Sequence, residues 1–340
     1  MIRITGDVSL TDGFFDVGYG LGSLIKEGDN PFLAIIKGDD FWIGNFEGVA
    51  SDTSCLSGVA AQQFRIDPFL LDEPIRLFDV FGVANNHVMQ HGDEAYEKTV
   101  DALQSRGKIA FGSSSKKSAL FEVGGKQFSI TGFSQRIDQF SKSPCYWHNP
   151  DFVEIWKEYQ TLPRDSFKIV YVHWGNEFIN RPSQSQVFMA HLLIDMGFDL
   201  VVGMHPHVIQ GFEEYKNKYI FYSLGNFSFD MSWEQTKYGA IVNIDCKGGE
   251  IQISHDYVFI DKSLHTKLVD EESVPIPFRF SSLNTLLGDE DNGEQYFKLV
   301  DMYYHQYRRA NRKDIVKKMM HHPQTACYVI KDFIKRRIIK

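Results

Sequence analysis

The amino-acid sequence predicts an α/β fold with additional antiparallel strands (α+β), followed by a helical C-terminal extension. Apolar, strand-like runs alternate with segments of helical spacing through residues 2–258. From residue 262 the pattern changes to a loop-like stretch with Pro275 and Pro277, and then to long helical segments. We therefore expect a main domain over residues 1–261 and an extension over residues 262–340 that packs on it.

The individual elements follow from the spacing of apolar residues. Strands are predicted at 2–5, 41–44, 78–84, 109–111, 119–123, 128–132, 167–172, 198–202 and 219–222. Helices are predicted at 68–77, 93–106, 150–159 and 183–196, and in the extension from 295 and over 324–339. Segment 93–106, for example, places Ala95, Val100 and Leu103 at helical spacing. A hairpin of 238–245 and 250–258, joined by Cys246-Lys247-Gly248-Gly249, is expected to close the main domain.

Composition and charge limit the functions to consider. The 340 residues are 43% hydrophobic and 24% charged, as in ordinary globular proteins, and the net charge of −8 does not favour nucleic-acid binding. Residues 301–340 differ, because they hold 11 Lys/Arg against 3 Asp/Glu. Such a basic segment on an acidic protein can be an interaction tail.

The cysteines and the first residues bear on location. Four scattered cysteines without a CxxC pair argue against a cysteine zinc site and a disulfide framework. Residues 1–7 enter a strand directly, with no basic and apolar leader, and no run approaches the ~20 apolar residues of a membrane span. We expect a cytoplasmic protein, and the sequence leaves its oligomeric state open.

Six short polar motifs stand out in the main domain, nearly all of them directly after an apolar run. They are Gly6-Asp7, Asn45-Phe46-Glu47-Gly48, Ala84-Asn85-Asn86-His87, His173-Trp174-Gly175, Gly203-Met204-His205-Pro206-His207 and Ser223-Leu224-Gly225-Asn226-Phe227. Because open α/β sheets place ligand-binding residues at their strand ends, these side chains could converge on one spot. Carboxylate, amide and imidazole groups are the ligands of divalent cations, so the motifs indicate a site for two metals.

Each motif taken alone also has a structural interpretation. Asp7 could be a turn or N-cap residue, Asn85-Asn86 could form a turn, and His173 could be a satisfied core histidine. A ligand role is favoured most for the two histidines that flank Pro206 directly after an apolar strand. The metal site is preferred because every structural interpretation would otherwise have to hold at once.

The last predicted helix combines basic residues with an apolar face that includes Val329, Ile330, Phe333 and Ile334. Such a helix can lie on an anionic membrane surface or dock on its own protein. We favour docking, because the main domain offers a surface for it.

The ordered motifs resemble those of the CapA/PgsA family of bacterial capsule-synthesis proteins, which act in poly-γ-glutamate synthesis and are similar in fold to calcineurin-like metallophosphoesterases. The resemblance covers residues 2–246, and six motifs in order are far more specific than one. It implies a four-layer αββα sandwich with a di-metal site at the strand ends.

The resemblance also implies roles for individual residues. The implied metal ligands are Asp7, Glu47, Asn86, His173, His205 and His207. His87 would lie beside the phosphate as a general acid or charge stabiliser, and Arg65 falls where the family often has a basic residue that could grip an anion. Glu177 belongs to a family motif and is a further catalytic candidate.

Three positions depart from the superfamily pattern. Ser9 stands where a metal-binding His is common, Glu47 replaces an Asp, and Gln90 replaces an Asp that usually follows the motif histidine. The resemblance therefore allows one or two divalent cations, and this ligand set accepts Mn²⁺, Fe²⁺ or Zn²⁺.

Three functions are compatible with these observations. The first is a metal-dependent hydrolase of a phosphate ester or anhydride in capsule, exopolysaccharide or polyglutamate production, acting on a phosphate-containing or anionic precursor. The second is an accessory factor of poly-γ-glutamate synthesis that works with capsule-synthesis machinery at the membrane. The third is a degenerate scaffold without metal, which Ser9 and Gln90 alone support.

Overall fold

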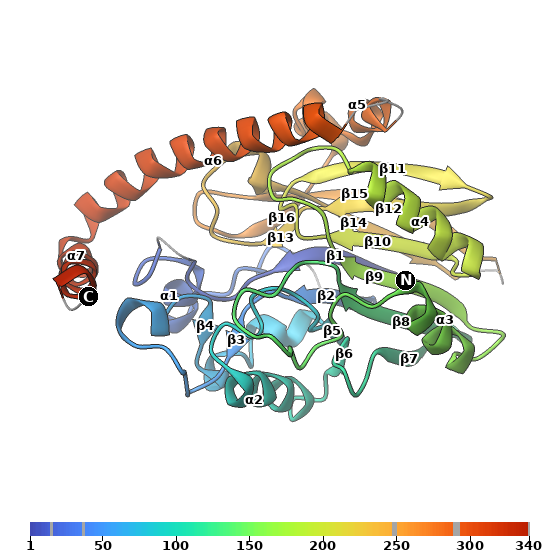
Figure 1. Ribbon diagram of the computed structural model, residues 1–340, viewed down its shortest axis with the longest axis horizontal. Coiled ribbons are helices and arrows are strands. Elements are labelled where there is room, and N and C mark those ends of the chain that lie inside the picture. The colour runs from blue at the N-terminus through green and yellow to red at the C-terminus, as the bar shows by residue number, and fades with distance from the viewer. Residues whose placement is uncertain (14–15, 36–37, 247–249, 288–292, 339–340) are drawn as a thin grey trace.

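Two stacked β-sheets with helices on their outer faces form the body of the protein (Figure 1). The computed structural model describes residues 1–13, 16–35, 38–246, 250–287 and 293–338. Helices α1 (Leu21–Lys26) and α2 (Asp93–Gln104) lie with the first sheet, and α3 (Phe152–Thr161) and α4 (Gln184–Met196) lie with the second. This arrangement confirms the predicted αββα sandwich.

The first sheet has the strand order β16-β15-β14-β1-β2-β5-β6, and β13 also pairs with β1. Its parallel part consists of β1 (Ile2–Val8), β2 (Phe41–Phe46), β5 (Val80–Gly82) and β6 (Ile109–Phe111). Its antiparallel part consists of β14 (Tyr238–Asp245), β15 (Gln252–Ile260) and β16 (Thr266–Val269), while β13 (Asn226–Ser228) runs parallel to β1.

The second sheet has the order β11-β12-β10-β9-β8-β7. Its strands are β11 (Ile209–Tyr215), β12 (Lys218–Leu224), β10 (Leu200–Met204), β9 (Phe167–His173), β8 (Lys126–Ser134) and β7 (Ser118–Val123). Strands β8, β9, β10 and β12 are parallel, so their carboxyl ends meet at one edge. A separate short pair is formed by β3 (Val49–Ala50) and β4 (Arg65–Ile66).

The apolar runs of the sequence are explained by burial on both faces of each sheet. In β9, Ile169 and Tyr171 pack into the core between the sheets, whereas Val170 and Val172 pack into the core shared with α3 and α4. A central strand of this kind has no solvent-facing side, and it therefore reads as a continuous apolar run.

Most predicted elements are confirmed with shifts of a few residues at their ends. The single helix predicted over 68–77 is wrong: two short 3₁₀ helices occupy it, Pro68–Leu70 and Pro74–Leu77. Pro74 has no backbone N–H to donate, so a continuous helix would lose a hydrogen bond there. Strands β11, β13 and β16 were not predicted. Within the predicted hairpin turn, residues 247–249 lie outside the described residues.

The C-terminal residues form helix α5 (Phe280–Leu283) and two longer helices, α6 (Gly293–His321) and α7 (Pro323–Ile338). Helix α6 runs along the top of the molecule in Figure 1 and leads to α7. In α7, Ala326 is buried, but Ile330, Phe333 and Ile334 are 47%, 56% and 48% exposed. Helix α7 contacts the main domain through other residues, because the Val59 N–H donates to Asp332 Oδ2 at 3.4 Å and Gln62 Nε2 donates to Tyr328 Oη at 3.2 Å. The division of the chain at residue 261 stays a prediction.

None of the helices within the described ranges combines the length and the apolar content that crossing a bilayer requires.

Candidate metal centre

Four strands from both sheets deliver polar side chains to one buried place. Asp7 lies in β1 and Glu47 directly follows β2, both in the first sheet. His173 is the last residue of β9 and His205 directly follows β10, both in the second sheet. All four are buried. The stacking of the two sheets therefore brings together residues that are up to 198 positions apart.

Glu47 lies at the middle of this cluster. Its Oε1 is 3.9 Å from Nε2 of His173, 3.8 Å from Nε2 of His207 and 4.0 Å from Nε2 of His87. These distances are too long for hydrogen bonds but suit donor atoms arranged around a cation.

Three overlapping triads of potential ligands have donor atoms within 4.8 Å of one another. They are Glu47, His173 and His205; Asp7, Glu47 and His207; and Glu177, His205 and His207. Because the triads share Glu47, His205 and His207, the geometry has room for more than one cation in a continuous site.

Asp7 is fixed by hydrogen bonds before any cation is considered. Asn45 Nδ2 donates to Asp7 Oδ1 at 2.9 Å, and the backbone N–H of His205 donates to Asp7 Oδ2 at 3.1 Å. The preceding Gly6 allows this approach, since a β-carbon there would lie 1.9 Å from the carbonyl oxygen of Gly225. The sequence Gly6-Asp7 thus places a rigid carboxylate between the sheets.

Two asparagines contact the histidine rings. Asn86 Oδ1 lies 2.8 Å from Nε2 of His173, and Asn226 Oδ1 lies 2.9 Å from Nδ1 of His207. The second contact fixes the ring and tautomer of His207, as carbonyl and carboxylate partners do for metal-binding histidines. Asn86 is therefore beside His173, at a separation that two ligands of one cation could also have.

The His205-Pro206-His207 turn has unusual backbone geometry. The φ angles of His205 and His207 are 96° and 59°, in the left-handed region that β-carbon-bearing residues rarely adopt. Such strain costs on the order of 1–3 kcal/mol per residue and persists where the surrounding structure imposes it, often at functional sites.

Several buried polar atoms in the cluster have no protein partner. Among the described residues, both carboxylate oxygens of Glu47 and both ring nitrogens of His205 are buried without a hydrogen bond. Leaving such groups unsatisfied costs about 1–3 kcal/mol each, and more for charged groups. A divalent cation would satisfy these atoms, so the donor set fits a metal.

The protonation states of two of the histidines agree with this chemistry. Burial lowers the pKa of His205 well below its ordinary value and lowers the pKa of His173 to about 3, so both are neutral at pH 7. Burial, followed by the charge of Asp7, raises the pKa of Glu47 well above its ordinary value. Burial alone would also raise the pKa of Asp7, but the hydrogen bond and charge of His207 lower it. Burial alone would lower the pKa of His207, but the hydrogen bond and charge of Asp7 raise it. His173 and His205 are thus in the neutral form in which imidazoles bind metals, whereas a cation would have to displace the protons favoured on Glu47 and His207.

His87 lies at the rim of the cluster. Its ring stacks on Phe64 with centroids 3.8 Å apart, and Nδ1 lies 3.0 Å from the acceptor Oε1 of Gln90. Nδ1 therefore carries the proton, and Nε2 presents a lone pair on the side of Glu47. Burial lowers the pKa of His87 to about 4.

Arg65 has other contacts. Its Nε donates to the carbonyl oxygen of Ala61 at 2.6 Å, and its Nη1 donates to that of Ser51 at 2.7 Å. These bonds hold two loop segments together beside β4. They give Arg65 a structural role, and its proposed grip on an anion has no support in these contacts.

Sequence reasoning missed two further contributors. Arg136, two residues beyond β8, donates through Nη1 to the carbonyl oxygen of Gly175, two residues beyond His173. The Tyr307 ring from α6 stacks on Phe178 at 3.9 Å, and the Phe178 ring lies 6.2 Å from that of His207. Neither position carries a local signal, because both contacts depend on segments that are distant in the chain.

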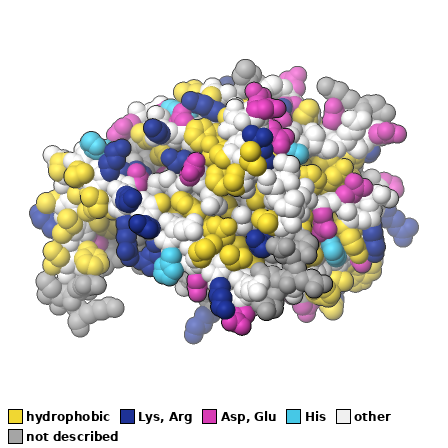
Figure 2. All heavy atoms as spheres, turned by 90° about the horizontal axis from the view of Figure 1, so that it is seen from above, with side chains coloured by type: hydrophobic (Ala, Val, Ile, Leu, Met, Phe, Trp, Pro, Cys, Tyr) yellow, Lys and Arg dark blue, Asp and Glu magenta, His cyan; other side chains and the backbone are white. Residues whose placement is uncertain are grey.

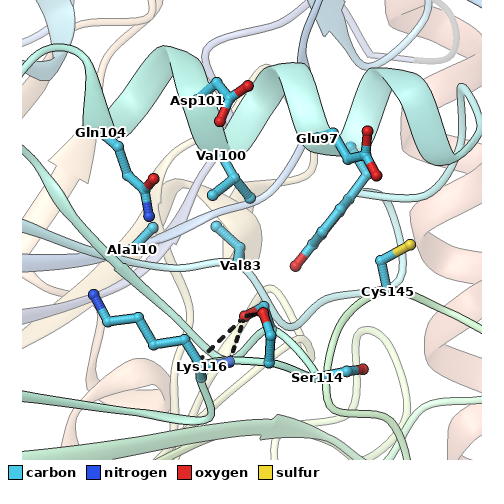
Figure 3. Close-up of a pocket in the computed structure, with 12 residues that line it drawn as sticks. Val83, Glu97, Val100, Asp101, Gln104, Ala110, Ser114, Lys116 and Cys145 are labelled. Atoms are coloured by element: carbon cyan, nitrogen blue, oxygen red, sulfur yellow. Dashed lines mark hydrogen bonds between the residues drawn. The ribbon is translucent and has the colours of Figure 1, made fainter.

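A cavity of about 580 Å³ lies elsewhere, between α2 and the loop after β6 (Figure 3). Figure 3 shows Glu97, Val100 and Gln104 on the helix side and Lys116 on the opposite side. None of the predicted site residues lines it. The metal centre is thus distinct from this cavity.

Solved structures with similar chain traces include hydrolases. A novel phosphatase from Mycoplasma pneumoniae aligns with a TM-score of 0.43 and 13% identity, over 79% of this chain and 92% of the other. A putative 5′-nucleotidase from Staphylococcus aureus aligns with a TM-score of 0.41 and 12% identity, over 89% and 57% of the two chains.

Curated relatives of this chain include proteins of capsule biosynthesis. The chain is 33% identical to the capsule biosynthesis protein CapA of Bacillus anthracis over 178 residues, which is 48% of this chain and 43% of that protein. It is 34% identical to the PGA biosynthesis protein CapA of Bacillus subtilis over 183 residues, which is 50% of this chain and 47% of that protein. A probable polyglutamine synthesis accessory protein of Mycobacterium tuberculosis is 27% identical over 168 residues, 43% of this chain and 44% of that protein. The matches thus span less than half the length of these relatives.

The model of the family described as bacterial capsule synthesis protein PGA_cap matches residues 1–231. This range contains all six polar motifs and every residue of the triads. Because the match spans more than half of the chain, the protein belongs to the PGA_cap family of bacterial capsule synthesis proteins.

Proposed function

We propose that this protein is a metal-dependent hydrolase that cleaves a phosphate ester or anhydride during the synthesis of a capsule polymer such as polyglutamate. The observation that carries the proposal is the pair of buried, unpartnered ligand groups, Glu47 and His205, inside a cluster of four further potential ligands, Asp7, His173, Glu177 and His207. Buried polar groups without a hydrogen-bonding partner are rare in native proteins, and a bound cation would supply the missing partner for these two.

The proposed ligands are Asp7, Glu47, Asn86, His173, His205 and His207. They would hold one or two divalent cations, with Mn²⁺, Fe²⁺ and Zn²⁺ all compatible with mixed oxygen and imidazole donors. When bound, such cations supply Lewis-acid activation of water and neutralise charge on phosphoryl oxygens. Glu177 shares a triad with His205 and His207 and is a further ligand or proton acceptor in this scheme.

The surrounding residues have defined tasks in the proposal. Asn45 and the His205 amide hold the Asp7 carboxylate in place, and Asn226 orients His207. His87, neutral and held by Gln90, would take up a proton from the reacting groups and return it to the leaving group. A negatively charged substrate would raise the pKa of His87 and so favour uptake of the proton in the first step.

The decisive experiment measures phosphatase and phosphodiesterase activity after loading with Mn²⁺, Fe²⁺ or Zn²⁺. His205→Ala should lose at least about 100-fold in kcat/KM and lose bound metal, because it removes a central ligand. His191→Ala is the matched control, since His191 pairs with Glu213 on the surface of the second sheet. Equal activity of His205→Ala and His191→Ala would contradict the catalytic proposal.

A second function, an accessory role in polyglutamate synthesis, is favoured by the name of the Mycobacterium tuberculosis relative. In this role a cytoplasmic protein would bind an anionic precursor or polymer and act together with a membrane-bound synthase. Metal binding without hydrolysis, combined with copurification of a synthase, would favour it over the hydrolase. Absence of Mn, Fe and Zn from the purified protein after supplementation would instead favour a metal-free scaffold.

A further inference from the structure

A second cavity, of about 380 Å³ and lined by both polar and apolar side chains, lies beside the candidate metal centre at the carboxyl ends of β8 and β9. Its lining includes Gln135, Arg136, Trp174, Gly175, Ser183 and Gln186. Trp174 and Gly175 directly follow His173, and the N–H of Gln135 donates to the carbonyl oxygen of His173 at 2.9 Å. The segment that contains His173 therefore contributes both to the cluster and, through Trp174 and Gly175, to the lining of this cavity.

Two buried donors that line this cavity have no acceptor among the described residues. They are Nε of Arg136 and Nε2 of Gln186. The Arg136 side chain is held in place, since its Nη1 donates to the carbonyl oxygen of Gly175 at 2.7 Å and to Asn176 Oδ1 at 3.4 Å. A guanidinium held in one position with an unpaired N–H can donate a hydrogen bond to a ligand. A negatively charged acceptor would form the strongest such bond.

Gln186 is 4% exposed and is held just as firmly. It occupies the third position of α4, where its Oε1 accepts from the backbone N–H of Ser183 at 3.0 Å in a capping box. This bond uses the oxygen of the amide and leaves Nε2 as a donor. Gly175 makes room beside that amide, because a β-carbon there would lie 2.6 Å from Nε2, and its φ of 81° also favours glycine.

The electrostatic surroundings favour negative charge. Ser183 caps the N-terminus of α4, a helix of 13 residues whose dipole places partial positive charge at this end. Among the described residues that line the cavity, Arg136 is charged and none is Asp or Glu. The residues that line this cavity thus carry two donors without an acceptor among the described residues, the charge of Arg136 and the N-terminus of α4.

We propose that this cavity is an oxyanion subsite that binds a carboxylate or phosphate group of the substrate, separate from the group that reacts at the metal centre. This inference rests on the proposed function in one respect, namely that the centre processes a substrate. It narrows the substrate class to molecules with at least two anionic groups. Arg136 and Gln186 would then select such substrates over simple monoesters.

The first test replaces the side-chain amide nitrogen of Gln186 with an oxygen atom. Gln186→Glu keeps the acceptor that caps Ser183 but replaces the unpartnered NH₂ with a carboxylate oxygen. Gln184→Glu adds the same charge to the same turn of α4 at an exposed position outside the cavity lining, and is the matched control. Arg136→Lys is a second variant, which keeps the charge but loses the planar donors.

Binding is measured by calorimetry with glutarate and with inorganic phosphate, on the protein as purified. His205→Ala is measured in parallel to separate phosphate at the metal centre from phosphate in the cavity. Wild type, His205→Ala and Gln184→Glu should bind an oxyanion, whereas Gln186→Glu and Arg136→Lys should lose about tenfold or more in affinity. Preference for glutarate or for phosphate identifies which oxyanion the cavity takes.

Kinetics provide the second readout. With 4-carboxyphenyl phosphate and phenyl phosphate as substrates, wild type and Gln184→Glu should show a lower KM for the carboxylated substrate. Gln186→Glu and Arg136→Lys should lose this preference, so that the KM values for the two esters become equal in these variants.

The two proposals fail in different ways. If no variant hydrolyses either ester but oxyanion binding depends on Gln186 and Arg136, the hydrolase proposal fails and the subsite stands. If the esters are hydrolysed but folded Gln186→Glu and Arg136→Lys bind glutarate and phosphate as wild type does, the subsite is overturned. Should Gln186→Glu not reach the thermal stability of Gln184→Glu, Arg136→Lys alone decides.

Discussion

Glu47 Oε1 and His173 Nε2 lie 3.9 Å apart, although one follows a strand of the first sheet and the other ends a strand of the second. The distance is too long for a hydrogen bond, and neither Glu47 oxygen has a hydrogen-bonding partner among the described residues. The two-sheet architecture therefore carries an energetic cost at its centre, and a cation shared between the sheets would remove it.

The first prediction follows from that cost. In metal-free protein, Glu47→Gln should raise the free energy of unfolding by about 1–3 kcal/mol at neutral to alkaline pH, because it removes a buried carboxyl group with no partner. Since the folded-state pKa of Glu47 is raised, stability in wild type falls as pH rises above the unfolded value, and the gain from the substitution should grow with pH. Urea unfolding with excess chelator measures this.

Metal binding should reverse the order of stability of wild type and Glu47→Gln. With saturating Mn²⁺, wild type should gain more stability than Glu47→Gln, because only the native carboxylate is a charged ligand. Asp52→Asn, which changes an acid exposed on the surface, is the control. Equal stabilisation of wild type and Glu47→Gln by metal would show that Glu47 is not a ligand.

The second prediction concerns Gln90, which contacts Nδ1 of His87. Gln90→Glu places a negative charge at that nitrogen, so it should raise the pKa of His87 from about 4 toward its ordinary value. The limb of the pH profile of kcat/KM that reports His87 should then move to higher pH. Gln90→Leu should not produce this upward movement, because it adds no charge. An unchanged profile in Gln90→Glu would exclude His87 from the titrations that limit the rate.

A substitution of Arg65 can distinguish a role in binding an anionic substrate from a role in holding the structure together. The sequence placed it among the catalytic candidates, whereas its contacts join it to the carbonyl oxygens of Ala61 and Ser51. We expect Arg65→Ala to lower the free energy of unfolding by about 1.5–3 kcal/mol while kcat/KM of the folded fraction stays within about twofold of wild type. Arg76→Ala, at an exposed arginine, is the control. A large rise in KM without loss of stability would restore the anion-binding role.

The sequence predicts those parts of the centre that are encoded locally. Asp7, His173 and His205 are visible because each ends or follows an apolar run, and parallel strands bring such ends to a common edge. Arg136 and Gln186 have no comparable signal, because their importance depends on a cavity formed by separate strands and a helix. The same reason explains α6: nothing around Tyr307 indicates that its ring stacks on Phe178 near the centre. The exposed apolar residues of α7 illustrate the opposite case, in which a local signal is present. Amphipathic spacing predicts that the helix has an apolar face, but it does not predict whether another part of the chain covers that face.

The last prediction concerns how α6 is attached to the main domain. Lys318 of α6 forms ion pairs with Asp314 and with Asp16, which is buried and also near Asp12 and Asp230. Burial raises the pKa of Asp16 to about 6, although Lys318 opposes this rise. Lys318→Met removes the counter-charge, so we expect the free energy of unfolding to fall by about 3–5 kcal/mol at about pH 8, where Asp16 must stay ionised without a partner.

The loss of stability in Lys318→Met should depend on pH, and the raised pKa of Asp16 gives the direction of this dependence. Because the folded-state pKa of Asp16 lies above its unfolded value, the folded state takes up the proton first as pH falls, and its stability rises relative to the unfolded state. The loss in Lys318→Met should therefore shrink at about pH 5, where Asp16 can be neutral. Lys317→Met, one residue earlier and exposed, is the control. A loss of equal size at both pH values would mean that Lys318 acts through packing of its side chain and not through its charge.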